Sequence, residues 1–194
     1  MVGPDSPVSG VRIEKTVRIA DNGRVTFQAR VTNIRSSEVA WDIWFNSRMD
    51  GFCRCYVPVH EAGDARVTGN ETATGGPMPW RVIDGFFTFD PAAPHPGKRT
   101  RSSKAFIQPA MGRIVGFTQT HALVIDLPVF PKASMHPEQA NVEIYNGTAM
   151  ERSEALLELE HHGPYRLLQP GESMNLEAQW RVRDYAGKNE PADH

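Results

Sequence analysis

Cysteine is scarce in this sequence, and long apolar runs are missing. The 194 residues include only two cysteines, Cys53 and Cys55, with no second Cys or His pair at zinc spacing, so neither a disulfide framework nor a zinc site is predicted. No stretch approaches the roughly 18 consecutive apolar residues of a membrane helix, and the first residues lack the basic and apolar regions of a signal peptide. We therefore expect no membrane partner, and either a cytoplasmic protein or a trimmed exported one.

Blocks of like charge are also lacking. The chain has 21 basic and 23 acidic residues, a formal net charge of -2, and no long run of either sign. Nucleic-acid backbones are usually bound by concentrated positive charge, so nucleic acid is not an expected partner. A phosphate-cradling glycine loop, a nucleophile elbow and a His-Glu-x-x-His motif are all missing. Nucleotide-dependent, nucleophile-elbow hydrolase and zinc-protease functions are therefore not predicted, and neither is a metal or cofactor.

What the sequence does contain is a series of short segments with strand periodicity. Apolar residues alternate with polar ones over 11–19 and again over 25–31, and Asn22-Gly23 between them suits a tight hairpin turn. Further strands are predicted over 39–45, 86–89, 106–112, 114–118, 122–130, 141–145, 155–160 and 173–183. Residues 60–79 and 97–104 are expected to be a long loop and a polar link. About ten short strands with almost no amphipathic helix favour an all-β sandwich.

The strand pattern predicts one domain over residues 10–185. Residues 1–9 and 186–194 show no periodicity and are expected to be disordered segments. The hydrophobic content of 40%, with nine phenylalanines and four tryptophans, is sufficient for a packed core.

Three segments together resemble the uncharacterised bacterial relatives of aldose 1-epimerase. The first joins Ala29-Arg30-Val31-Thr32-Asn33 to Val39-Ala40-Trp41-Asp42-Ile43-Trp44, and the second runs from His136 to Tyr145 and contains Val-Glu-Ile-Tyr. The third is the most specific: Leu157-Glu158-Leu159-Glu160-His161-His162-Gly163-Pro164, followed by Gln169-Pro170-Gly171-Glu172 and Trp180-Arg181-Val182. The resemblance implies an all-β, galactose mutarotase-like β-sandwich.

The resemblance covers only the later part of that family domain, which suggests a truncated supersandwich. Without the strands that normally come first, a sheet edge or face would remain uncovered, and exposed edges favour association. We therefore expect either a homodimer or a trimmed sandwich.

The same resemblance implies where epimerase chemistry would lie. In aldose epimerases a glutamate base and a histidine acid transfer the proton, and the closing block places Glu158 or Glu160 where the base would be. The family's acid histidine is replaced here by Trp44-Phe45-Asn46-Ser47. His121, His136, His161 and His162 are the histidines that could replace it, and the enzyme alternative takes His121, His136 or His161 as the acid. His161 and His162 stand at the end of a strand, where a solvated corner is the simpler interpretation. Adjacent histidines on a strand face opposite ways, so His161 and His162 are not expected to share a metal.

Aromatic and arginine side chains supply candidate ligand contacts. Aromatic rings can stack on sugar surfaces, although they also fill sandwich cores. Trp41 and Trp180 are expected in the core, whereas Trp44 and Trp80 are candidate ligand-binding residues. Arg48 and Arg81 lie near these segments and are added as candidates for holding a polar ligand.

Taken together, these features predict a carbohydrate-binding sandwich without intact epimerase chemistry. One alternative is an aldose 1-epimerase-like enzyme that uses Glu158 or Glu160 as base. The other is a structural module that forms a homo-oligomer, for which an uncovered apolar patch would be the sign.

Overall fold

The computed structural model describes residues 1–69, 77–91, 101–148 and 155–186, which form antiparallel strands and two short 3-10 turns. The strands are β1 Val11–Ile19, β2 Val25–Asn33, β3 Val39–Trp41, β4 Trp44–Asp50, β5 Arg54–Pro58, β6 Ala65–Gly69, β7 Trp80–Ile83, β8 Phe86–Phe89, β9 Arg101–Ile107, β10 Arg113–Phe117, β11 His121–Asp126, β12 Val142–Thr148, β13 Leu156–His162, β14 Arg166–Leu168 and β15 Ser173–Asp184. The turns are η1 Ala62–Asp64 and η2 Lys132–Ser134.

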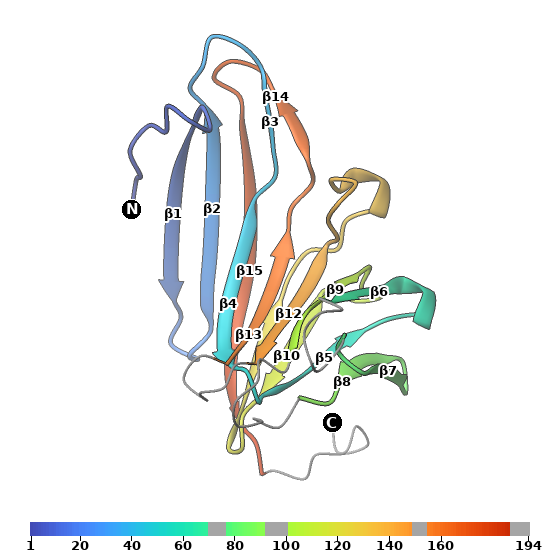
Figure 1. The fold of residues 1–194 in the computed structure, drawn as a ribbon. Coiled ribbons are helices and arrows are strands. Elements are labelled where there is room, and N and C mark those ends of the chain that lie inside the picture. Colours follow the sequence, from blue (N-terminus) through green and yellow to red (C-terminus); the bar gives the residue numbers. More distant parts are fainter. Residues whose placement is uncertain (70–76, 92–100, 149–154, 187–194) are drawn as a thin grey trace.

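Two large sheets form the sandwich, and a third, small sheet lies beside it (Figure 1). The eight-stranded sheet has the order β1-β2-β15-β11-β10-β5-β8-β7, and the five-stranded sheet has the order β4-β13-β12-β9-β6. Strands β14 and β3 pair separately at one end of the molecule. The all-β sandwich predicted from the strand periodicity is confirmed.

The first hairpin follows directly from its sequence. Strands β1 and β2 pair from Val11↔Asn33 to Ile19↔Val25, and Gly23 takes a φ of 76° in the turn between them. A positive φ is readily adopted by glycine, so the Asn22-Gly23 pair fixes both the turn and the register of the two strands.

The main core lies between the two large sheets. It contains Phe87 and Phe89 from the eight-stranded sheet together with Ile144, Leu157 and Leu159 from the five-stranded sheet, all fully buried. Because side chains alternate along a strand, burying one face of β12 and β13 leaves their other residues on the opposite face of the sheet. That opposite face carries the polar groups described below.

At the β1 end the apolar face is only partly covered. Ile13, Val17 and Ile19 share the face of the buried Val11, yet they are 40%, 55% and 75% exposed. The homodimer that was expected to cover such a face stays a prediction.

Several predicted element boundaries were wrong. The segment 39–45 is divided between β3 and β4, with Asp42 and Ile43 between them. Strand β6 lies within the expected loop 60–79, and β9 includes part of the expected polar link 97–104. Polar side chains alternate with the few apolar ones in both strands, and this weakens the apolar signal in the sequence.

Residues 1–9 were expected to be disordered, and the first three of them lie along β1. Val2 forms a bridge with Glu14, and the Gly3 amide donates to the carbonyl of Ile13 at 2.8 Å. The predicted C-terminal tail falls on residues 186–194, of which 187–194 lie outside the described residues.

Both cysteines are buried, and burial raises the pKa of the Cys55 thiol. Within the described ranges, no helix has the length and apolar character needed to cross a membrane.

Candidate functional site

The outer face of the five-stranded sheet gathers charged and polar side chains. On β13 the alternation directs Leu157, Leu159 and His161 to the core, while Glu158, Glu160 and His162 lie on the other face. The neighbouring strands repeat this arrangement, because residues directly opposite each other in a sheet share a face. A charged surface therefore forms on the reverse side of the main core.

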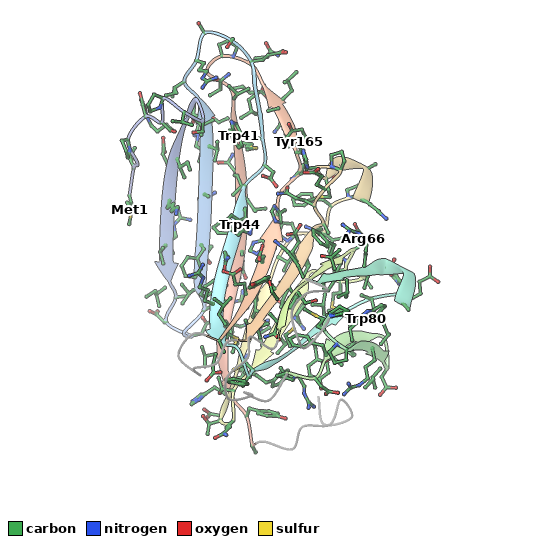
Figure 2. All side chains as sticks on the ribbon, in the orientation of Figure 1. Met1, Trp41, Trp44, Arg66, Trp80 and Tyr165 are labelled. Atoms are coloured by element: carbon green, nitrogen blue, oxygen red, sulfur yellow. The ribbon has the colours of Figure 1, made fainter. Side chains whose placement is uncertain are left out.

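Two adjacent cross-strand rows define this surface, which we call the polar platform. Each row crosses the sheet from β6 to β4. The first row is Arg66, Phe106, Glu143, Glu160 and Asn46; the second is Thr68, Lys104, Tyr145, Glu158 and Arg48. Next to the first row, Trp44 pairs with His162, and the polar platform includes this pair. Figure 2 shows Trp44 at β4 and Arg66 at β6, the two edge strands of the sheet.

At the centre of the platform a lysine joins two buried carboxylates. The Lys104 ammonium lies 2.6 Å from Glu143 Oε2 and 3.0 Å from Glu160 Oε2. Both glutamate side chains are 1% exposed, whereas that of Lys104 is 30% exposed. Buried charges must be paired to be tolerated, so Lys104 is the group that makes this pair of carboxylates stable.

His162 extends the set of charges to Asp42. Its Nδ1 lies 2.7 Å from Asp42 Oδ2, and its Nε2 lies 3.5 Å from Glu143 Oε2. Asp42, His162, Glu143, Lys104 and Glu160 therefore alternate acid and base in space, and we call them the acid–base cluster.

The cluster changes the pKa values of its members in different directions. Burial favours the neutral form of His162, but Asp42 and Glu143 outweigh it and raise the pKa of His162 to about 9. Burial alone would raise the pKa of Glu143, yet His162 and Lys104 bring that pKa below its usual value. The pKa of Glu160 is raised, because burial and the charge of Glu143 outweigh the contacts with Lys104 and Trp44.

Trp44 is held in place by the cluster. Its indole Nε1 donates to Glu160 Oε2 at 2.8 Å, and its ring stacks on His162 with centroids 6.2 Å apart and an interplanar angle of 14°. Trp44 is nevertheless 54% exposed. The platform thus presents a fixed, largely open aromatic ring beside a row of charged groups.

The cluster also brings together donor atoms that could ligate a metal. Each of three residues offers one ligand atom, and these atoms lie within 4.8 Å of one another: Glu143, Glu160 and His162. Lys104 already places a positive charge against both carboxylates, so a metal ion bound there would have to displace the ammonium. The prediction that no metal is required stays a prediction.

The platform unites four of the candidate residues named from the sequence: Glu158, Glu160, Trp44 and Arg48. Arg48 donates through Nε to Glu158 Oε1 at 2.9 Å, and the Arg48 side chain is 70% exposed. Glu158 and Glu160 lie on one face as expected, but only Glu160 belongs to the acid–base cluster.

The three candidate acids lie elsewhere. His161 points into the core against Phe45, where burial lowers its pKa to about 3. His136 follows η2 and contacts the ring of Tyr165 edge-on at 4.8 Å. His121 begins β11 in the other large sheet, and its Nδ1 lies 2.8 Å from the Thr120 hydroxyl. None of these three belongs to the platform rows.

Trp80 and Arg81 lie on β7, an edge strand of the eight-stranded sheet. Trp80 stacks on Phe87 at 5.7 Å, and Arg81 donates two hydrogen bonds to Asp90 at 2.5 and 3.0 Å. The structure does not bring them together with Trp44 and Arg48. Trp41, expected in the core, is 42% exposed, because β3 lies in the small sheet and outside the main sandwich.

Sequence reasoning missed Lys104, Glu143 and Asp42, and it interpreted His162 as a solvated corner residue. Glu143 carried a signal, since it is the one charged residue in the otherwise apolar and aromatic stretch Val142–Tyr145. Lys104 carried none, because its pairing with Glu143 and Glu160 depends on strand register between distant segments.

Solved structures share this fold at low sequence identity. A proposed aldose 1-epimerase from Escherichia coli K12 is similar over 95% of this chain and 64% of its own, with 14% identity and a TM-score of 0.51. A galactose mutarotase-like protein from Lactobacillus casei aligns over 89% of this chain and 63% of its own, with 13% identity and a TM-score of 0.52. A proposed aldose 1-epimerase from Klebsiella pneumoniae aligns over 93% of this chain and 49% of its own, with 12% identity and a TM-score of 0.54.

These likenesses confirm the galactose mutarotase-like sandwich, and at such identities they show the fold alone. The chain spans less than two thirds of the length of each of these proteins. No relative was found among curated proteins. A family model described as a domain of unknown function, DUF4380, matches residues 1–183, and the chain therefore belongs to this uncharacterised family.

Proposed function

We propose that this protein binds a carbohydrate on the polar platform of its five-stranded sheet. The observation that carries the proposal is Trp44, a 54% exposed indole fixed by Glu160 and His162 beside the first row of charged and polar side chains. A sugar ring offers an apolar C–H face and a rim of hydroxyl groups. An aromatic ring next to hydrogen-bonding side chains is complementary to both.

The remaining platform residues supply the hydrogen-bonding groups. Arg48 and Thr68 are exposed, and the Tyr145 hydroxyl lies 3.1 Å from the Ser102 hydroxyl. Adjacent strands are about 4.8 Å apart, so Trp44 on β4 and Phe106 on β9 are separated by roughly 14 Å across the sheet. That span exceeds a single sugar ring, which favours an oligosaccharide as the ligand.

Binding fits the platform better than turnover does. Glu143 and Glu160 are 1% exposed and already contact Lys104, and Glu160 also accepts from Trp44. A general base must reach the proton that it removes, at about hydrogen-bond distance. A ligand would instead meet Trp44 and Arg48, which are exposed, and the partly exposed Lys104.

A binding measurement with matched tryptophan variants tests the proposal. We expect isothermal titration calorimetry against a panel of neutral and acidic oligosaccharides to detect a ligand for the wild-type protein. Trp44→Ala should then weaken binding about five- to thirtyfold, since losing a stacked ring costs on the order of 1–2 kcal/mol.

Trp41→Ala is the matched control, because Trp41 is similarly exposed and lies in the separate small sheet. It should bind like the wild type. Equal affinity of the Trp44 and Trp41 variants would contradict the placement of the site, and a wild-type protein that binds no member of the panel would contradict the function.

A second candidate function is acid–base chemistry on an aldose ring, with Glu160 as the titrating group. It is favoured by the opposite pKa shifts of Glu143 and Glu160, since carboxyl pairs with separated pKa values are typical of acid–base sites. Polarimetry of freshly dissolved aldoses tests it. A wild-type acceleration of mutarotation that Glu160→Gln removes would establish turnover, and no acceleration by the wild type would reject it.

A further inference from the structure

One end of the polar platform carries a cation without an acidic partner. Arg66, on the edge strand β6, places its guanidinium carbon 4.2 Å from the centroid of the Phe106 ring. Among the described residues, no carboxylate pairs with Arg66. The other platform cations are all paired, Arg48 with Glu158 and Lys104 with both central glutamates.

The Phe106 ring holds this guanidinium in position. A guanidinium over an aromatic face gains a cation–π attraction, and the ring restricts the long arginine side chain. Because Arg66, Phe106 and Glu143 are directly opposite one another in register, the guanidinium lies on the same face of the sheet as the cluster.

Lys104 approaches the same ring from the next row. Its Nζ is 5.8 Å from the Phe106 centroid and contacts Glu143 and Glu160. An ammonium has three hydrogens to donate, so these two carboxylates leave one donor of Lys104 available. Arg66 and the third hydrogen of Lys104 are therefore two positively charged donors flanking one aromatic ring.

From this arrangement we infer that the saccharide bound on the platform is acidic and places a carboxylate between Arg66 and Lys104. The inference rests on the proposed carbohydrate-binding function and specifies the class of sugar, a uronate. The planar guanidinium fork matches a carboxylate with two parallel hydrogen bonds, and the third ammonium hydrogen of Lys104 can donate to the same carboxylate.

Pairs of oligosaccharides that differ only in their carboxylates provide the test. The probes are galacturonate, glucuronate and mannuronate oligomers, each compared with its carboxyl-reduced, neutral form at low ionic strength. We expect the wild-type protein to bind at least one acidic member about fivefold or more tightly than its neutral counterpart, as a partly exposed charge pair would give. Added salt should reduce the difference, because screening weakens exposed pairs.

Arg66→Gln should abolish this preference, so that the acidic and the neutral forms bind this variant with equal affinity. Arg18→Gln, a change at an exposed arginine of β1 in the other sheet, is the matched control and should keep the preference.

The outcomes separate this inference from the proposed function. Equal binding of acidic and neutral forms, with sensitivity to Trp44→Ala, would overturn the uronate assignment and leave the carbohydrate site standing. A preference that survives Arg66→Gln would overturn the role of Arg66. Tighter binding of a sulfated oligomer of equal length would assign sulfate in place of carboxylate, and no binding of any probe would overturn both proposals.

Discussion

Replacing Lys104 by methionine tests the acid–base cluster most severely. The change keeps the length and apolar stem of the side chain but removes the ammonium that lies 2.6 and 3.0 Å from Glu143 and Glu160. Both carboxylates are 1% exposed, so water cannot replace the missing charge without a rearrangement. Lys104→Met therefore leaves two buried acids that repel each other.

The expected loss of unfolding free energy is about 3 kcal/mol at pH 8. Removing one partner of a buried ion pair typically costs about 3–5 kcal/mol, and the 30% exposure of the Lys104 side chain favours the lower end of that range. Glu160 limits the penalty, because it can take up a proton and remain buried as a neutral acid.

The loss should depend on pH with a definite sign. The pKa of Glu160 is raised above its usual 4.5 in the folded protein, and removing Lys104 removes a group that lowers it. A carboxyl group whose pKa is raised in the folded protein keeps its proton at pH values at which the unfolded chain has already lost it. The stabilising contribution of Glu160 is therefore present at low pH, and it is lost as pH rises through the pKa that Glu160 has in the folded protein. Lys104→Met should therefore be closer to the wild type at pH 5 than at pH 8.

Urea unfolding at the two pH values measures both effects. Lys15→Met, a change at an exposed lysine of β1, is the control and should stay within about 0.5 kcal/mol of the wild type. Adding Glu160→Gln should make Lys104→Met about 1–2 kcal/mol less destabilising, since one of the two buried charges is then gone. A loss below about 1 kcal/mol that is the same at both pH values would show that Lys104 does not compensate the two buried carboxylates.

Two further measurements probe the same structure. In a proton NMR titration, His162 should titrate near pH 9, and His161 should remain neutral down to about pH 3. A shared titration midpoint near pH 6.5 would show that the two histidines do not face opposite sides of the sheet. Since the pKa of His162 is raised, its contribution to stability should be complete below about pH 6.5 and lost as pH rises through 9, and His162→Gln should remove that dependence. Gly112→Ala should lower the free energy of unfolding by about 2–4 kcal/mol, because an added Cβ would overlap the Leu127 carbonyl. Gly63→Ala should cost less than about 1 kcal/mol, because the added Cβ meets only the end of the Glu61 side chain. Urea unfolding measures both losses, and similar values would contradict this difference in packing.

The sequence predicted the fold well where local chemistry decides the structure. The hairpin at Asn22-Gly23 and the strands of the closing block, Leu157 to Val182, could both be predicted from the sequence. Turn chemistry and strand alternation each depend on only a few neighbouring residues. It predicted β6 and β9 poorly, because a short strand with one polar face differs little from a loop in composition.

The candidate site was predictable only in part. Glu160 and Trp44 could be named from the closing block and from the Trp-bearing strand, but their contact joins residues 116 positions apart. Lys104 reaches Glu160 through the register of three strands, β9, β12 and β13, and no local pattern encodes that register. Single-residue reasoning also misjudged His162, whose environment is set by Asp42 and Glu143 from two other segments.

The measurement that most directly tests carbohydrate binding on the platform is a two-dimensional NMR titration of the four tryptophan indole N–H signals with an oligosaccharide. Trp44 lies on the platform, whereas Trp41, Trp80 and Trp180 lie in other strands outside it, and each signal can be assigned from its Trp→Phe variant. We expect the Trp44 signal to shift with saturation while the other three stay in place. Saturable shifts confined to Trp80 or Trp41, or no shift of any indole with any saccharide, would contradict it.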